Sequence, residues 1–106
     1  MQKEPKRFWI YITANEPRGV LYVGMSSDLA SRAWQHRERV IEGFTSKYGV
    51  DRLVYFEEHS DAALAARRER AMKRWRRDWK IKLIEGFNPT WRDLFSDVVR
   101  VEGFEP

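Results

Sequence analysis

The stretch FWIYITANEPRGVLYVG, residues 8–24, decides the fold of this chain. Its two ends, FWIYIT (8–13) and VLYVG (20–24), are rich in β-branched and aromatic residues, and the NEPRG between them is rich in turn-forming residues. This pattern predicts a β-hairpin. With a four-residue loop, Tyr11 pairs with Tyr22 and the two phenols share one face of the sheet. An ordinary aromatic pair explains the same pattern, and another loop length changes the pairing.

After the hairpin, the pattern predicts one helix and a third strand. The helix is capped by Ser26 or Ser27, has Asp28 in its first turn and stops at Gly43. The third strand is RLVYFEEH (52–59), which is again rich in β-branched and aromatic residues.

The second half of the chain is expected to be helical. Ser60 caps a helix that runs from Asp61 into a basic tract, and a further helical piece reaches Ile84. Asn88-Pro89 ends that piece, and Thr90 caps a last short helix, WRDLFSDV. The order β-β-α-β-α-α predicts a small α+β domain.

The composition limits the classes of function. With 106 residues, the chain is expected to form a single domain over 1–106, with a core of about 8–95 and a short acidic tail. It has no cysteine, which excludes disulfides and thiol catalysis, and its two histidines cannot supply a three-ligand zinc site unaided. No apolar run approaches the roughly 20 residues of a membrane span, and the N-terminus is polar. We therefore expect a cytoplasmic protein that does not contact membranes.

The basic charge is concentrated in residues 67–82, RRERAMKRWRRDWKIK, which hold nine basic and two acidic residues. The remaining residues carry no basic surplus. Such a tract suits a polyanion, although an arginine-rich solvated helix face has the same composition. Trp75 and Trp79 within it can stack on bases or form the buried stripe of the helix.

Helical periodicity brings together three further residues of chemical interest. On the first helix, His36 lies in the apolar stripe of Leu29, Ala33 and Val40, and Arg32 is its neighbour at i−4. A buried core histidine is the plainer interpretation of His36.

Glu69 is the single carboxylate between Asp61 and Asp78. It lies beside the apolar stripe of the second helix, which comprises Leu64, Ala65, Ala71, Met72 and Trp75. Glu69 can bind Mg²⁺ or simply pair with Lys73.

Taken together, these residues resemble the GIY-YIG nuclease family. The matching motifs are WIY (9–11), YVG (22–24), SSDLASRAWQH (26–36) with Arg32 and His36, Glu69 in RRERAMKRW and, loosely, Asn88. The resemblance covers about Phe8 to Phe95 and is greatest to short stand-alone bacterial members, which are related to the N-terminal nuclease domain of the bacterial excinuclease. Two departures are Trp9, in place of the first glycine, and Met25, where some relatives carry a lysine.

The resemblance implies a three-stranded antiparallel sheet flanked by helices and a site for phosphodiester hydrolysis. Tyr11 would act on the attacking water, Tyr22 would orient it, and Arg32 would stabilise the transition state. His36 would assist proton transfer or hold Tyr11, Glu69 would bind one Mg²⁺ or Mn²⁺, and Asn88 would position phosphate.

The expected function is that of a metal-dependent DNA endonuclease, structure-selective and linked to repair or recombination. RNA is an alternative substrate, and no small-molecule cofactor is expected. The residues expected to bind nucleic acid are Lys47, Arg67, Arg70, Lys73, Arg74, Arg76 and Arg77. Two alternatives stay open: a binding module with weak or absent catalysis, and a basic helix that docks on a protein groove or an anionic membrane.

Overall fold

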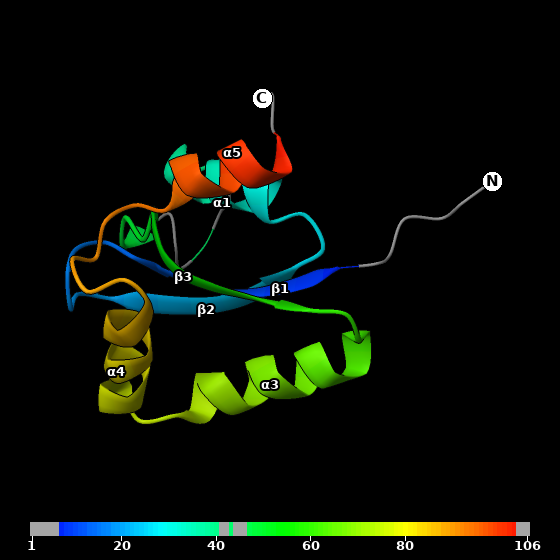
Figure 1. The fold of residues 1–106 in the computed structure, drawn as a ribbon. Helices are drawn as coiled ribbons and strands as arrows, with labels where there is room; N and C mark the ends of the chain where they lie inside the picture. Colours follow the sequence, from blue (N-terminus) through cyan, green and yellow to red (C-terminus); the bar gives the residue numbers. More distant parts are fainter. Residues whose placement is uncertain (1–6, 41–42, 44–46, 104–106) are drawn as a thin grey trace.

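The computed structural model describes residues 7–40, 43 and 47–103. Within them, three strands form an antiparallel sheet in the order β2-β1-β3, with the bounds β1 Phe8–Ala14, β2 Leu21–Ser26 and β3 Arg52–His59. Helices α1 (Leu29–Arg37) and α5 (Phe95–Glu102) cover one face of the sheet, and α3 (Ala62–Arg74) and α4 (Arg77–Phe87) cover the other (Figure 1). This arrangement confirms the predicted α+β class, with a three-stranded antiparallel sheet flanked by helices.

The central strand β1 is buried on both faces and divides the core in two. Ile10 and Ile12 pack with the cluster below the sheet, which includes Met72 of α3 and Ile84 of α4. Tyr11 packs with the cluster above the sheet, which α1 and α5 complete. Alternation along the strand therefore places Tyr11 on the α1 side of the sheet.

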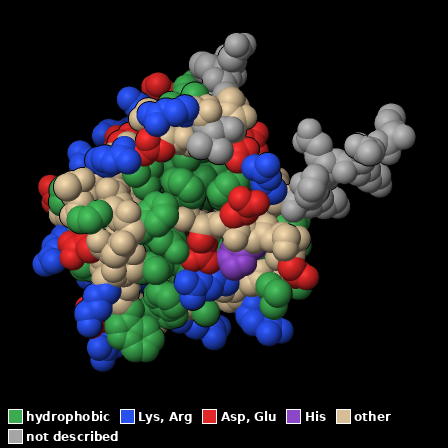
Figure 2. Space-filling model, viewed as in Figure 1, with side chains coloured by type: hydrophobic (Ala, Val, Ile, Leu, Met, Phe, Trp, Pro, Cys, Tyr) green, Lys and Arg blue, Asp and Glu red, His purple; other side chains and the backbone are tan. Residues whose placement is uncertain are grey.

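Apolar side chains also reach the surface between the two helical layers (Figure 2). Phe87 is 48% exposed and packs edge-on against Tyr55 and Phe56 of β3, at centroid distances of 5.1 and 5.2 Å. These aromatic contacts tie the end of α4 to the edge strand of the sheet.

The predicted cross-strand pairing of Tyr11 with Tyr22 was wrong, because the hairpin loop is longer than expected. Ala14 pairs with Leu21, so Tyr11 lies opposite Gly24 and Tyr22 lies opposite Thr13. The longer loop is closed by Asn15, whose side-chain Oδ1 accepts a hydrogen bond from Val20 N at 2.8 Å. A shift of two residues keeps both phenols on the same face.

Helices α1 and α3 begin slightly later than predicted, because an aspartate rather than the serine before it is the N-cap. Asp28 caps α1 by accepting a hydrogen bond from Ser31 N at 3.2 Å, and Asp61 caps α3 by accepting one from Leu64 N at 2.8 Å. Aspartate at the N-cap accepts this hydrogen bond as serine does, and its charge also interacts well with the helix dipole.

The first helix also ends earlier than predicted. It ends at Arg37 rather than Gly43, because Arg39 adopts a left-handed φ of 56°. Val40, predicted for the buried stripe, is 56% exposed, and residues 41 and 42 lie outside the described residues. Leu64 of the second predicted stripe is likewise 54% exposed.

The basic tract is split between two helices. Trp75 and Arg76 are extended, with ψ near 150°, and separate α3 from α4. No helix in the described part of the chain has the length and apolar character of a membrane span.

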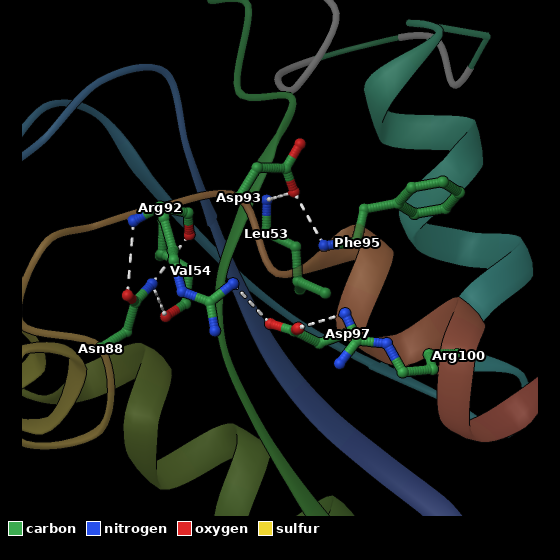
Figure 3. Close-up of polar contacts among 8 residues, drawn as sticks. All are labelled: Leu53, Val54, Asn88, Arg92, Asp93, Phe95, Asp97 and Arg100. Carbon is green, nitrogen blue, oxygen red and sulfur yellow. Dashed lines mark hydrogen bonds and ion pairs between the residues drawn. The ribbon is translucent and has the colours of Figure 1, made fainter.

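The segment before α5 runs along the outer edge of β3 (Figure 3). Asp93 Oδ1 accepts hydrogen bonds from Leu53 N at 3.3 Å and Phe95 N at 3.0 Å, and Leu94 N donates to Leu53 O at 2.8 Å. The expected start of the last helix at Thr90 was therefore wrong, because this segment bonds to the sheet edge before the helix begins. Helix α5, Phe95–Glu102, lies in the first part of the expected acidic tail and packs on α1.

Candidate active site

Tyr11 extends across β2 toward the edge of the sheet, over Gly24. A Cβ atom at position 24 would lie 2.4 Å from Tyr11 Oη and 2.9 Å from Cε1 of Tyr22. Gly24 therefore provides the space that the two phenols occupy. The ring centroids of Tyr11 and Tyr22 are 6.3 Å apart, so the two rings share one patch of the sheet.

Helix α1 brings His36 onto this pair of tyrosines. His36 Nε2 is 3.0 Å from Tyr11 Oη, and its ring centroid lies 5.4 Å from each tyrosine ring. The imidazole is only 3% exposed, and its Nδ1 has no hydrogen-bond partner within the described residues. The contact with Tyr11 is thus the polar interaction that orients His36.

His36 is a neutral base in this environment. Burial, together with the positive charge of nearby Arg32, lowers the pKa of His36 to about 4. The imidazole is therefore uncharged at neutral pH and has a lone pair that can accept a proton.

Tyr11 is held in its protonated form. Burial and the neighbouring Tyr22 and Glu69 raise the pKa of Tyr11 above its usual value, whereas the charge of Arg32 opposes them. The groups that act electrostatically on the Tyr11 hydroxyl come from β2, α1 and α3. Arg32 is half-buried, and no carboxylate of the described residues pairs with it, so its charge is available to an anionic ligand.

Glu69 approaches the site from α3, on the other side of the sheet. Its side chain is 18% exposed, and Lys73 Nζ lies 3.0 Å from its Oε1. The predicted ion pair with Lys73 is therefore present, and the Glu69 carboxylate also raises the pKa of Tyr11 electrostatically. No cluster of three metal-ligating side chains occurs in the described residues. A single carboxylate with water and phosphate oxygens fits Mg²⁺, which keeps much of its hydration shell.

Asn88 lies at the end of α4 beside the outer edge of β3, not with the other predicted site residues (Figure 3). Its Nδ2 donates to Val54 O at 3.2 Å and to Arg92 O at 2.8 Å, and its Oδ1 accepts from Arg92 N at 3.3 Å. The buried amide thus joins the end of α4 to the outer edge of β3. All of these hydrogen bonds go to backbone atoms.

Three of the predicted nucleic-acid-binding residues form a row on α3. Arg67, Arg70 and Arg74 are exposed and recur at about one-turn spacing. Within the described residues, their side chains form no ion pair or hydrogen bond. This row is therefore open to an anionic partner.

The other four predicted binding residues already have partners. Each is engaged within the chain: Lys73 with Glu69, Arg76 with Asp78, Arg77 with the backbone carbonyls of Arg18 and Gly19, and Lys47 with the ring of Tyr48. These contacts are at the surface, where ion pairs are weak, so phosphate can compete for the cations.

A polar network on the opposite face of β3 was missed from the sequence. Glu57 accepts hydrogen bonds from Tyr55 Oη at 2.6 Å and from Arg68 at 3.0 and 3.1 Å, and His59 Nε2 is 2.5 Å from it. Burial alone would raise the pKa of Glu57, but the hydrogen bonds from Arg68, Tyr55 and His59 outweigh it and lower that pKa. The network anchors α3, which carries Glu69, to β3. Its one sequence signal is the alternation of Tyr55, Glu57 and His59 on a single strand face.

The two departures from the family motifs lie outside the tyrosine pair. Trp9 is buried and packs edge-on against Phe56, with centroids 5.9 Å apart. Met25 packs on the α3 and α4 side of the sheet, the opposite face from Tyr11. The ionisable group beside the Tyr11 hydroxyl is the neutral imidazole of His36.

The fold is that of a small α+β domain in which Tyr11, Tyr22 and His36 meet on one face of the sheet. The family model described as GIY-YIG catalytic domain matches residues 7–82. Because this is most of the chain, the protein belongs to the GIY-YIG family, whose domain implies nuclease activity on a nucleic acid. Nucleases of this family generally depend on a divalent metal ion. Searches of curated proteins and of solved structures gave no significant match.

The buried neutral state of His36 makes the stability of the fold depend on pH. Its pKa is about 4 in the fold and about 6.5 when exposed, so the stabilisation is complete above pH 6.5 and is lost toward pH 4. We expect the difference in unfolding free energy between wild type and His36→Gln to shrink by about 2–3 kcal/mol from pH 7 to pH 4.5. Urea unfolding of both proteins at pH 7 and pH 4.5 measures this difference. A difference that stays constant would contradict a neutral, buried His36.

Proposed function

We propose that this protein is a metal-dependent endonuclease that hydrolyses phosphodiester bonds in DNA. The observation that carries the proposal is the 3.0 Å contact between Tyr11 Oη and His36 Nε2, with Tyr22, Arg32 and Glu69 around it. A protein that only binds nucleic acid needs the basic surface but has no use for a buried phenol beside a neutral imidazole.

The Tyr11–His36 pair offers a route for the proton of the attacking water. The raised pKa of Tyr11 makes its phenol a weak acid, so a free phenolate is scarce at neutral pH. As the Tyr11 oxygen takes a proton from water, it passes its own proton to His36 Nε2. Neutral His36 is able to accept it, and the nearby phosphate charge favours the resulting imidazolium.

Arg32 and Tyr22 act on the phosphate and the water. Arg32 supplies a fixed positive charge next to Tyr11, and this charge stabilises the additional negative charge of the transition state. The Tyr22 ring packs beside Tyr11 and His36, so its hydroxyl orients the water or a phosphate oxygen at the same place.

Glu69 is the proposed ligand of one Mg²⁺ or Mn²⁺. Its side chain is largely enclosed, its charge acts on Tyr11, and release of Lys73 would free the oxygen that Lys73 holds. When bound, the ion supplies Lewis-acid stabilisation of the charge on the phosphate and the leaving oxygen.

The row of Arg67, Arg70 and Arg74 is proposed to bind the DNA backbone. Each phosphate that an arginine neutralises on a duplex contributes about −0.9 to the slope of log affinity against log salt. We therefore expect the double variant Arg70→Gln, Arg74→Gln to flatten that slope by about 2. Arg92→Gln is the matched control, because Arg92 pairs with Asp97 at 2.7 Å, away from α3. An unchanged slope in the double variant would remove the row from the interface.

Cleavage of end-labelled nucleic acids tests the proposal. Single-stranded, duplex and branched DNA, and the matching RNA strands, are incubated with excess protein and Mg²⁺ or Mn²⁺. The proposal predicts DNA cleavage that stops when the metal ion is chelated. Binding without cleavage of any substrate would instead favour a nucleic-acid-binding module, and preference for RNA would correct the substrate.

A further inference from the structure

Trp79 is an unusually exposed tryptophan at the junction of α3 and α4. Its residue surface is 50% exposed, whereas Trp9 and Trp91 are 7% and 3% exposed. Figure 2 shows apolar surface at this junction, at the lower left of the molecule, flanked by Lys and Arg side chains. An exposed indole beside cations offers a flat apolar face to a planar, negatively charged partner.

The Trp79 ring is held in a defined orientation by its neighbours. It packs edge-on against Trp75 with centroids 6.1 Å apart and an interplanar angle of 74°. The Arg68 guanidinium lies 4.9 Å from the centre of the Trp75 ring and is itself bound by Glu57. A chain of contacts therefore runs from β3 to the exposed indole and fixes it before any ligand arrives.

The charges around Trp79 favour an anionic partner. The Arg76 guanidinium lies 5.5 Å from the centre of the Trp79 ring, at the start of α4. The helix that precedes the junction carries the exposed row of Arg67, Arg70 and Arg74. A partner that meets both features presents a planar ring and a row of negative charges.

We propose that Trp79 is a stacking platform for an unpaired base of the nucleic-acid strand that the arginine row binds. This inference rests on the proposed function only in taking a nucleic acid as the partner. The bases of an intact duplex are stacked on one another and have no free face for an indole, so the platform favours single-stranded or frayed segments. A docked helix or a membrane would need a broader apolar face than the Trp75–Trp79 pair, which the guanidinium groups of Arg68 and Arg76 flank.

Binding to a single-stranded oligonucleotide and to a duplex of equal length tests the platform. The measurement is fluorescence anisotropy of the labelled DNA with wild type, Trp79→Ala and Trp79→Phe, in chelator and without metal so that no cleavage occurs. Base stacking on an aromatic side chain predicts that Trp79→Ala weakens single-strand binding by about 5- to 150-fold, with little effect on the duplex. Trp79→Phe restores most of the affinity, and the salt slope stays unchanged because stacking involves no charge.

Leu64→Ala is the matched control, because it removes an apolar side chain that is also exposed, at 54%, but lies on α3 and outside the tryptophan pair. The platform would be overturned if Trp79→Ala lost affinity equally for both DNA forms or lost none. It would also be overturned if Leu64→Ala lost as much affinity as Trp79→Ala, or if wild type did not bind the single strand. Trp79-dependent binding to anionic phospholipid vesicles in place of DNA would overturn it as well. Cleavage failure with intact Trp79-dependent binding refutes the nuclease proposal alone, so the two failures are distinguishable.

Discussion

Tyr11→Phe is expected to lower the rate of DNA cleavage by about 10²–10⁴-fold, the contribution of a positioned proton-transfer group. Phenylalanine fills the same buried space but lacks the hydroxyl that lies 3.0 Å from His36 Nε2. The loss leaves the imidazole without its partner and should reduce the unfolding free energy by about 1–3 kcal/mol. Single-turnover cleavage, with DNA binding measured in parallel, separates the catalytic loss from a binding loss.

Tyr55→Phe is the control for this prediction. Tyr55 is also buried and its pKa is also raised, but its hydroxyl donates to Glu57 on the opposite face of the sheet. The pair between Glu57 and Arg68 remains in this variant, so we expect cleavage to be retained. Equal losses in both variants would mean that the Tyr11 effect is one of stability, which would contradict its role in proton transfer.

Gly24→Ala is expected to disrupt both the site and the fold. The new Cβ would lie 2.4 Å from Tyr11 Oη and 2.5 Å from its Cζ, so the phenol must move away from His36. Overpacking of this kind costs about 1–3 kcal/mol of stability, and a displaced Tyr11 should abolish most of the cleavage. Thermal unfolding and single-turnover cleavage measure the two effects.

Gly86→Ala is the matched control for Gly24→Ala. Gly86 lies in α4, and a Cβ atom there meets nothing within 4 Å among the described residues. Alanine at an exposed helical position should leave cleavage unchanged and stabilise the fold by about 0.5–1 kcal/mol. If Gly24→Ala behaved like Gly86→Ala, the close approach of Tyr11 to β2 would not be required for activity.

Much of the fold was predictable because its signals are local. The alternation and turn residues of 8–24 and of 52–59 predicted all three strands closely, and the order of the helices followed from caps and breakers. The hairpin register was not predictable, because NEPRG permits loops of several lengths. The side chain of Asn15 closes the longer loop and decides between them.

The site was predictable where the spacing along one element placed side chains together. Arg32 and His36 lie one turn apart on α1, so the helix itself brings both to Tyr11. The bonds of Asn88 depend on Val54 and Arg92, which its own segment does not predict. Likewise, the network of Glu57 and Arg68 joins a strand to a helix and leaves little trace in either segment alone.

The most direct test of a metal-dependent centre is the rate of DNA cleavage measured against Mg²⁺ and Mn²⁺ concentration for wild type and Glu69→Gln. Glutamine keeps the size of the side chain but removes the charge that a divalent ion needs, and it also removes the ion pair with Lys73. We predict a saturable dependence on metal ion in wild type and loss of cleavage in Glu69→Gln, with DNA binding and folding preserved. Cleavage by Glu69→Gln with the wild-type metal dependence would contradict the assignment of Glu69, and cleavage by wild type in excess chelator would contradict metal-dependent hydrolysis.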